Sequence, residues 1–258
     1  MTPEEPSRSA GTSLPRQGSE TTALDDPERV RSEYASELRL EQRRAAYRWS
    51  EGPDPREVAF AAVAEVSPRR ILEVGCGPGE LAARLAAELR ADVVAVDVSP
   101  RMVELTRQRG VDARLGDVQE LAFADGEFDC AVAAWMLYHV PDLDLGVSEL
   151  RRVLAPAGRL VTVTNGLDHM RELSHLLGGT QLMEPASFRC DNGADLLARH
   201  FRRVERREAA GWVVFPDRGA AQAYVDATVV LSQGGRQLPP LEGPVRVRRA
   251  SCVFVAEA

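Results

Sequence analysis

The sequence contains no lysine, so arginine supplies all 32 of its strongly basic side chains, and Ile71 is its only isoleucine. This bias is typical of a GC-rich genome, and we therefore interpret the arginine clusters first as solvated surface. The formal net charge is -7. An acidic chain is a poor general binder of nucleic acid, so we expect no nucleic-acid partner.

Cysteine is also scarce. Cys76, Cys130, Cys190 and Cys252 are widely separated and form no C-x-x-C pair, which predicts buried free thiols rather than a zinc site or a disulfide framework. No apolar run approaches the ~18 residues that span a bilayer. The acidic start lacks an apolar stretch before a small-residue cleavage site, so we expect no secretory signal and a soluble, cytoplasmic protein.

Large apolar side chains are almost absent from residues 1–25, which are rich in Pro, Ser, Thr, Gly and Glu. Such a segment cannot bury enough surface to offset its ordering entropy, so we expect a disordered tail. Helical spacing of apolar residues then predicts one helix over 27–50 and a second over 55–66, where Pro55 suits the first helical position. We expect the region 26–68 to be a helical cap on a main domain over 69–258.

The main domain begins with an alternation of short apolar runs and helical stretches. Runs rich in Val and Leu without polar alternation predict strands that are covered on both faces, as in a parallel sheet. The pattern therefore predicts a doubly wound α/β fold. We expect strands over 70–74, 92–98, 112–115, 128–134 and 159–164, and helices over 80–89, 100–109 and 147–154.

The last hundred residues are less regular. Their patterns predict helices over 168–177, 193–200 and 218–231, a strand over 202–211 that can continue to Phe215, and a final strand over 247–256.

Three glycines, Gly75, Gly77 and Gly79, lie between the first predicted strand and its helix. Glycine permits unusual backbone angles and lets a ligand lie against the chain. The spacing is G-x-G-x-G, whereas dinucleotide-binding folds use G-x-G-x-x-G. The glycines alone therefore leave open a tight turn without a ligand, a dinucleotide site and another nucleoside site.

Two acidic residues narrow this choice. Glu73 precedes the glycines, where a carboxylate would repel phosphate but could accept hydrogen bonds from an ammonium group. Asp97 ends the next predicted strand, 18 residues beyond Gly79, where an acidic side chain can hold both hydroxyls of a ribose. Together these residues indicate a nucleoside that carries an amino-acid tail.

These motifs resemble those of the class I S-adenosylmethionine-dependent methyltransferases. The segment I-L-E-V-G-C-G-P-G-E-L at 71–81 resembles their first motif, and V-V-A-V-D-V-S-P-R-M-V at 93–103 resembles their ribose-binding motif. Further similarity lies at 116–119, 128–140 and 150–161. Within the superfamily the sequence looks most like the small-molecule branch, methyltransferase type 11, which includes ubiquinone and menaquinone C-methyltransferases.

The resemblance implies a seven-stranded Rossmann-like sheet, mostly parallel with the last strand antiparallel, and S-adenosylmethionine as the cofactor. Departures from the minimal pattern imply a substrate-specific insertion around 166–200 and 212–245. Asp117 can instead be a loop acid or a helix cap, and Met102 can instead be core. The implied cofactor contacts are Glu73, Gly75, Cys76, Gly77, Gly79, Ala134 and Trp135 for the methionine part, Asp97 for the ribose, and Val98, Met102, Asp117 and Val118 for the adenine.

Methyl transfer from a sulfonium needs chiefly positioning and exclusion of water, so we expect no metal. Tyr138 and His139 follow the fourth strand, at the sheet edge where ligands bind, and are the candidate catalytic residues. Imidazole titrates near neutrality, which suits His139 to accept a proton. A cofactor-wall role or a purely structural role for His139 remains open.

Several residues outside these motifs are weaker candidates for the substrate site. The N-terminal helices can supply a lid, or their aromatic residues can be core. The segment after the fifth strand can contact substrate, and so can the aromatic residues that follow the strand at 202–211. These candidates are Tyr34, Arg48 and Trp49 for the lid, and Asn165, His169, His175, Trp212 and Phe215 for the substrate.

We expect the protein to transfer a methyl group to O, N or C of a small-molecule metabolite, as a monomer or homodimer without a membrane span. The alternative is a catalytically silent protein that binds S-adenosylmethionine as a partner or regulatory subunit. Glu73 and the glycine spacing disfavour a nicotinamide-dependent dehydrogenase. Nucleic-acid methylation is disfavoured because residues 133–136 read A-A-W-M, not Asn-Pro-Pro-Tyr or Asp-Pro-Pro-Tyr. A cysteine nucleophile is also disfavoured, because Cys76 lies in the glycine loop and Cys130 in a strand.

Overall fold

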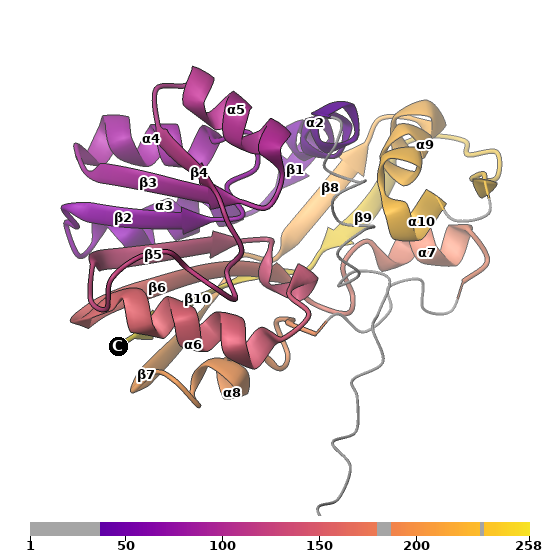
Figure 1. Cartoon of the computed structure of the whole chain (residues 1–258). Helices are drawn as coiled ribbons and strands as arrows, with labels where there is room; N and C mark the ends of the chain where they lie inside the picture. The colour runs from indigo at the N-terminus through magenta and orange to yellow at the C-terminus, as the bar shows by residue number, and fades with distance from the viewer. Residues whose placement is uncertain (1–36, 180–186, 233–234) are drawn as a thin grey trace, which may run out of the picture.

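The computed structural model describes residues 37–179, 187–232 and 235–258 (Figure 1). The expected tail over 1–25 and the start of the cap, including Tyr34, lie outside these residues. The region 26–68 contains, among the described residues, α2 (Glu37–Ala46), the 3-10 helix η1 (Tyr47–Trp49), β1 (Ser50–Glu51) and α3 (Pro55–Ala64), and α3 packs on the main sheet rather than in a separate cap. Helix α3 begins at Pro55 because Asp54 accepts a hydrogen bond from the Arg56 backbone N–H, which caps the helix.

The main sheet confirms the predicted fold class. Its order is β4-β3-β2-β5-β6-β10-β7, and β10 runs antiparallel to both β6 and β7. The strands are β2 (Arg70–Val74), β3 (Asp92–Asp97), β4 (Asp112–Leu115), β5 (Phe128–Ala134), β6 (Leu154–Asn165), β7 (Arg203–Glu208) and β10 (Ser251–Glu257).

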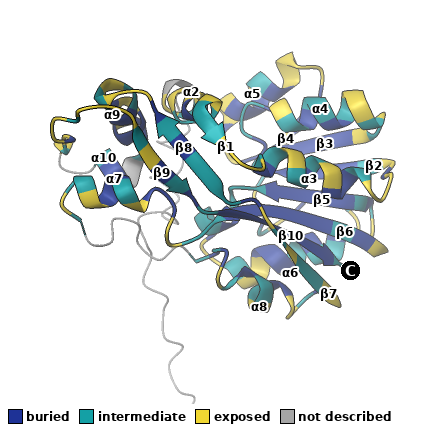
Figure 2. Cartoon of the chain, turned by 180° about the vertical axis from the view of Figure 1, so that it is seen from behind, coloured by how far each residue is buried: buried dark blue, intermediate teal, exposed yellow. Residues whose placement is uncertain are grey.

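Helices cover both faces of this sheet (Figures 1 and 2). One face packs on α3, α4 (Glu80–Leu89) and α5 (Pro100–Gln108) through residues such as Ile71, and the other packs on α6 (Leu143–Val153) and α8 (Gly193–Leu197) through residues such as Leu72. The alternation of Ile71 and Leu72 between two buried faces explains why the central strands carry no polar alternation.

Two predicted boundaries in this region differ from the structure for local reasons. Helix α6 begins at Leu143 rather than at 147, because the Asp142 side chain accepts a hydrogen bond from the Leu145 N–H and caps the helix there. Strand β6 begins at Leu154, which pairs with Phe128, but its continuous pairing starts at Arg159 as predicted, because the ladder shifts register over 155–158, where the turn was expected.

A second, three-stranded sheet was not predicted. Its order is β1-β8-β9, with β8 (Gly211–Phe215) between β1 and β9 (Val245–Arg249), and all pairs are antiparallel. The predicted strand 202–211 and its continuation to Phe215 are therefore two strands, β7 and β8, in different sheets. The predicted final strand 247–256 is likewise two strands, β9 and β10, which separate at Ala250.

The second sheet joins the N-terminal cap to the C-terminal segment. It packs on α2, α7 (Arg171–Leu176) and α9 (Arg218–Ala227) through a core that contains Phe215 and Tyr224. The predicted helix 218–231 is broken at Thr228, whose hydroxyl donates to the Tyr224 carbonyl, and continues as α10 (Val229–Ser232). Strand β1 pairs with β8, so the N-terminal helix α2 and the C-terminal segment with β8, β9 and α9 form one unit beside the main sheet (Figure 1).

The expectation of four free thiols is wrong for two of them. Cys190 and Cys252 form a disulfide whose Cα atoms are 5.8 Å apart across a sequence separation of 62 residues. Cys76 and Cys130 are free and buried, as expected. None of the helices in the described ranges has the length and apolarity that a bilayer crossing requires.

Candidate functional site

A cavity of about 470 Å³ lies at the carboxyl ends of β2, β3, β5 and β6. Helices α2, α9 and α10 also contribute to its wall, so the cap faces the edge of the main sheet. The parallel strands point their carboxyl ends at this edge, which is where ligands of open α/β sheets bind. The cavity is lined by Glu73, Gly75, Cys76, Gly77, Asp97, Val98, Asp117, Val118, Ala134, Trp135, Tyr138 and His139, among others.

The glycine loop leaves β2 and enters α4 through left-handed backbone angles. Gly75 has φ +64°, and a Cβ on it would lie 2.6 Å from the Met136 Cβ, so only glycine fits there. Gly79 has φ +78° and is the N-terminal cap residue of α4. Gly79 does not line the cavity and shapes the turn into α4, so its contact with the cofactor stays a prediction.

Glu73 is the most perturbed acidic residue of the site. It is 3% exposed, and its Oε2 atom has no hydrogen-bond partner among the described residues. Burial, and then the negative charge of Asp97, raise the pKa of Glu73 to about 8. A buried carboxyl oxygen without a partner beside a cavity is suited to a cationic ligand group.

Asp97 ends β3 and organises the loop around it. Its Oδ2 accepts the Gly77 N–H at 2.9 Å, and its Oδ1 accepts the Ser99 N–H at 2.9 Å. Burial nevertheless raises the pKa of Asp97. The Val98 backbone N–H also bonds to this carboxylate, so about one of its four lone-pair positions is left to accept a hydrogen bond from a ligand in the cavity.

Met102 and Asp117 differ in how they relate to the cavity. Met102 is fully buried and does not line it, so the predicted adenine contact is replaced by a core position. Asp117 does line it, but its carboxylate also accepts hydrogen bonds from the backbone and side chain of Gln119. Asp117 therefore shapes its own turn, and the Val118 backbone follows it along the cavity wall.

The segment after β5 contributes the candidate catalytic residues. Trp135 has φ +54°, which is rare for an aromatic residue, and η2 (Leu137–His139) follows it. Tyr138 and His139 both line the cavity, and their rings are 4.5 Å apart in an edge-to-face arrangement. The structure thus brings both residues to the cavity in which Glu73 and Asp97 lie.

The cap contributes different residues from those expected. Trp49 packs edge-to-face on Phe215 with ring centroids 6.0 Å apart, and neither it nor Arg48 lines the cavity. Tyr47 lines it instead and hydrogen-bonds the Tyr224 side chain, which links η1 to α9 over the cavity. Nothing in the local pattern distinguishes Tyr47 from Trp49, because both lie in one helical run.

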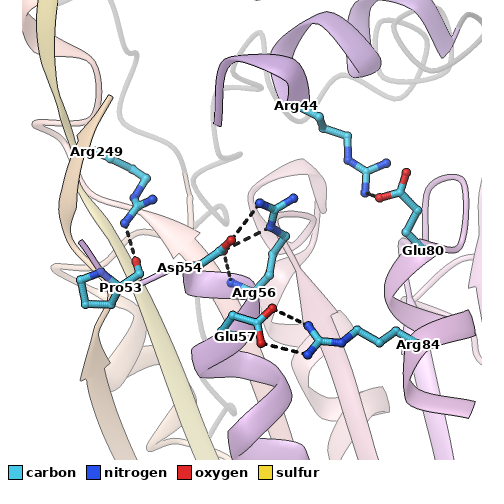
Figure 3. A network of polar contacts seen from close by, with 8 residues as sticks. All are labelled: Arg44, Pro53, Asp54, Arg56, Glu57, Glu80, Arg84 and Arg249. Atoms are coloured by element: carbon cyan, nitrogen blue, oxygen red, sulfur yellow. Dashed lines mark hydrogen bonds and ion pairs between the residues drawn. The ribbon is translucent and has the colours of Figure 1, made fainter. Parts of the chain in front are cut away.

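An ion pair joins α2 to the main domain at the cavity rim, where Arg44 of α2 pairs with Glu80 of α4 (Figure 3). Outside the cavity, Arg84 of α4 forms two hydrogen bonds with Glu57 of α3, which joins two helices that cover the same face of the main sheet. Arg249, only 1% exposed, donates to the Pro53 carbonyl, which precedes α3. The cap is therefore held to both the glycine-loop helix and the second sheet.

The segment after β6 contributes Asn165 and His169 to the cavity, whereas His175 is exposed on α7 and does not line it. Burial lowers the pKa of His169 to about 4, and its ring hydrogen-bonds the Ala250 backbone. His169 is therefore neutral near pH 7. Of the other aromatic candidates, Phe215 is core and Trp212 lies under the Arg246 guanidinium, and neither lines the cavity.

Within the described ranges, no group of three or more His, Cys, Asp or Glu side chains is arranged to hold a metal ion.

Comparison with known proteins matches residues 72–162 to the family described as "Methyltransferase domain". The demethylmenaquinone methyltransferase of Thermus thermophilus is 38% identical over 106 residues, which cover 38% of this chain and 48% of that protein. The curated relatives are thus matched over less than half of their own length, between 28% and 48%.

Two solved structures share the fold. An S-adenosylmethionine-dependent methyltransferase of Thermotoga maritima, described as a possible histamine N-methyltransferase, has a TM-score of 0.53 at 20% identity and covers 84% of this chain and 94% of its own. The cyclase SpnF has a TM-score of 0.55 at 16% identity and covers 89% of this chain and 95% of its own. At these identities the similarity concerns the fold alone.

The residues around the cavity fit the cofactor of this family. The unpartnered Glu73 oxygen suits an ammonium group, the absent Cβ of Gly75 allows close approach to the loop, and Asp97 keeps an acceptor position for a hydroxyl. The matched family model, the strand order of the main sheet and the chemistry of these residues all point to the same kind of cofactor site. Residues 72–162 therefore match the methyltransferase domain, and the cavity beside them fits S-adenosylmethionine as its cofactor.

Proposed function

We propose that the protein transfers a methyl group from S-adenosylmethionine to an O, N or C atom of a small-molecule acceptor. The observation that carries this proposal is that one cavity wall includes both the Glu73–Asp97 region and Tyr47, His139 and Asn165. Methyl transfer requires the cofactor and the acceptor to lie side by side, so the cavity must offer one region for each of them. The matched relative named for demethylmenaquinone also acts, by its name, on a small molecule.

When bound, S-adenosylmethionine supplies an electrophilic methyl group on a sulfonium. The chain then has to hold the cofactor, orient the acceptor and exclude water. We assign the amino-acid end to Glu73 and the glycine loop, the ribose to Asp97 and the adenine to Val98, Asp117 and Val118. The remaining wall, with Tyr138, His139 and the Tyr47–Tyr224 pair, is left for the acceptor.

Labelled methyl transfer tests this function. The full chain is incubated with S-adenosylmethionine carrying an isotopic methyl label and with a panel of phenols, amines and carboxylic acids, and the label is followed into product. Transfer to an acceptor supports the proposal. Tight cofactor binding without transfer to any compound would instead support the catalytically silent binding protein.

The affinity for S-adenosylhomocysteine should rise with pH between about 6 and 8. Because the pKa of Glu73 is raised from 4.5 to about 8, this carboxyl is protonated at pH 7 when no cation is bound. An ammonium group favours the carboxylate, so binding releases a proton below pH 8, and the affinity rises by up to about tenfold per pH unit. Calorimetry in buffers of different ionisation enthalpy measures the released proton.

Two variants control this experiment. Glu73→Gln should abolish the pH dependence, whereas Glu88→Gln, on the exposed face of α4, should keep it. The raised pKa of Glu73 also affects stability. Between pH 4.5 and 8 the Glu73 carboxyl is ionised in the unfolded chain but protonated in the folded chain, so the free energy of unfolding of the cofactor-free protein falls as the pH rises. Equal affinity and no proton release across this range would exclude the proposed role of Glu73.

His139→Ala should lower kcat by about 100-fold, the lower range for a positioned acid or base, with S-adenosylhomocysteine affinity unchanged. If His139 accepts a proton, the wild-type rate rises with pH through the imidazole titration and the variant loses that rise. Steady-state kinetics over pH 5–9 measure both effects. The control is His175→Ala on exposed α7, and an unchanged kcat in His139→Ala would rule out catalysis by this residue.

A further inference from the structure

The side-chain amide of Asn165 is held in one orientation at the end of β6. Its Oδ1 accepts the Trp135 indole N–H at 3.3 Å and the Ser251 hydroxyl at 2.8 Å. These partners follow β5 and begin β10, the two strands that flank β6 in the sheet. Three neighbouring strands therefore meet at this one side chain.

The identity of the amide oxygen follows from the donors around it. An indole N–H can only donate, so the Asn165 atom that faces Trp135 must be the oxygen. The Ser251 hydroxyl then occupies the second lone pair of that oxygen. The two N–H groups on Nδ2 are left, and within the described residues nothing accepts a hydrogen bond from them.

Asn165 lines the cavity and is only partly buried, so its Nδ2 group is available to a ligand there. The two residues that hold its oxygen are themselves fixed by burial and backbone pairing. Ser251 is 1% exposed and lies opposite Asn165 in the β6–β10 ladder. Trp135 is held at φ +54° and donates its backbone N–H to the Val163 carbonyl at 2.8 Å. Such a backbone angle in an aromatic residue is costly and concentrates at functional sites.

We infer that Asn165 determines acceptor specificity by donating an N–H to an oxygen atom of the acceptor. This inference rests on the proposed methyl transfer and narrows its substrate class. A hydroxyl, carbonyl or carboxylate oxygen can accept this hydrogen bond. A protonated amine presents only N–H donors, which would face the donors of Asn165, so the site selects acceptors bearing such an oxygen over ammonium compounds.

The test uses the full chain saturated with S-adenosylhomocysteine, and phenol and benzylamine as probes in ligand-observed NMR titrations. Asn165→Asp is nearly isosteric and keeps an oxygen for Trp135 and Ser251, but it turns the cavity-facing N–H donors into a carboxylate oxygen. The control is Gln108→Glu, the same amide-to-carboxylate change at an exposed residue of α5 that does not line the cavity. Ser251→Ala tests the positioning by removing one of the two donors.

We expect the wild type to prefer phenol. Asn165→Asp should weaken phenol binding by about tenfold and strengthen benzylamine binding, with the affinity for S-adenosylhomocysteine unchanged. Gln108→Glu should leave the preference intact, and Ser251→Ala should reduce it. An unaltered preference in Asn165→Asp, or no binding of either probe by the loaded wild type, overturns the assignment. Failure of the wild type to bind S-adenosylhomocysteine would instead overturn the proposed function itself.

Discussion

Asp97→Ala should weaken binding of S-adenosylhomocysteine by about 100-fold or more. In the cofactor-free chain its carboxylate accepts the backbone N–H groups of Gly77 and Ser99, each at 2.9 Å. Bonds to a charged acceptor contribute about 1.5–3 kcal/mol each. The substitution removes the bonds that order the glycine loop and also the proposed acceptor for the ribose. The loss of two bonds of this strength corresponds to about 100-fold in the dissociation constant.

Isothermal titration calorimetry measures this loss, and circular dichroism verifies that the variant is folded. The control is Asp92→Ala, at the opposite end of the same strand, where the side chain is 62% exposed and pairs with Arg70. That surface pair contributes little, so the control should retain the wild-type affinity. A folded Asp97→Ala protein with unchanged affinity would exclude Asp97 from the cofactor site.

Cys190→Ala should lower the free energy of unfolding by about 4 kcal/mol, because the disulfide with Cys252 closes a loop of 62 residues and restricts the unfolded chain. The bond also anchors a wall of the cavity. Phe188 and Arg189 line the cavity beside Cys190, and the Phe188 carbonyl accepts the Thr164 hydroxyl at 3.0 Å. Loss of the bond should therefore weaken acceptor binding as well as stability.

Chemical denaturation with and without a reductant measures the stability effect. Cys130→Ala is the matched control, since it deletes the same sulfur from a buried free thiol in β5. Reductant should destabilise the wild type and Cys130→Ala but leave Cys190→Ala unchanged. If reductant has no effect on the wild type and Cys190→Ala loses no more stability than the control, the two sulfurs are thiols in solution, as the spacing of the cysteines predicted.

The cofactor side of the site was accessible from sequence because its determinants are local. The β2 strand, the glycine loop and α4 are contiguous, and the predicted bounds 70–74 and 80–89 agree with the structure. A glycine with left-handed backbone angles sets the turn at its own position, and a capping residue sets the start of the helix that follows it directly. Met102 shows the limit of this reasoning, since its place in the motif could not distinguish a cavity wall from the core behind it.

The sequence by itself determined the doubly wound α/β class and the acidic and glycine residues that point to a sulfonium nucleoside, because periodicity and short motifs encode them locally. Only the tertiary structure decided that 202–215 and 245–257 each divide between two sheets, that Cys190 meets Cys252, and that Tyr47 and Asn165 face one cavity. Which sheet a strand joins, and which side chains meet at a cavity, depend on contacts between residues far apart in the chain. A local sequence pattern predicts a strand but does not identify its partner strand.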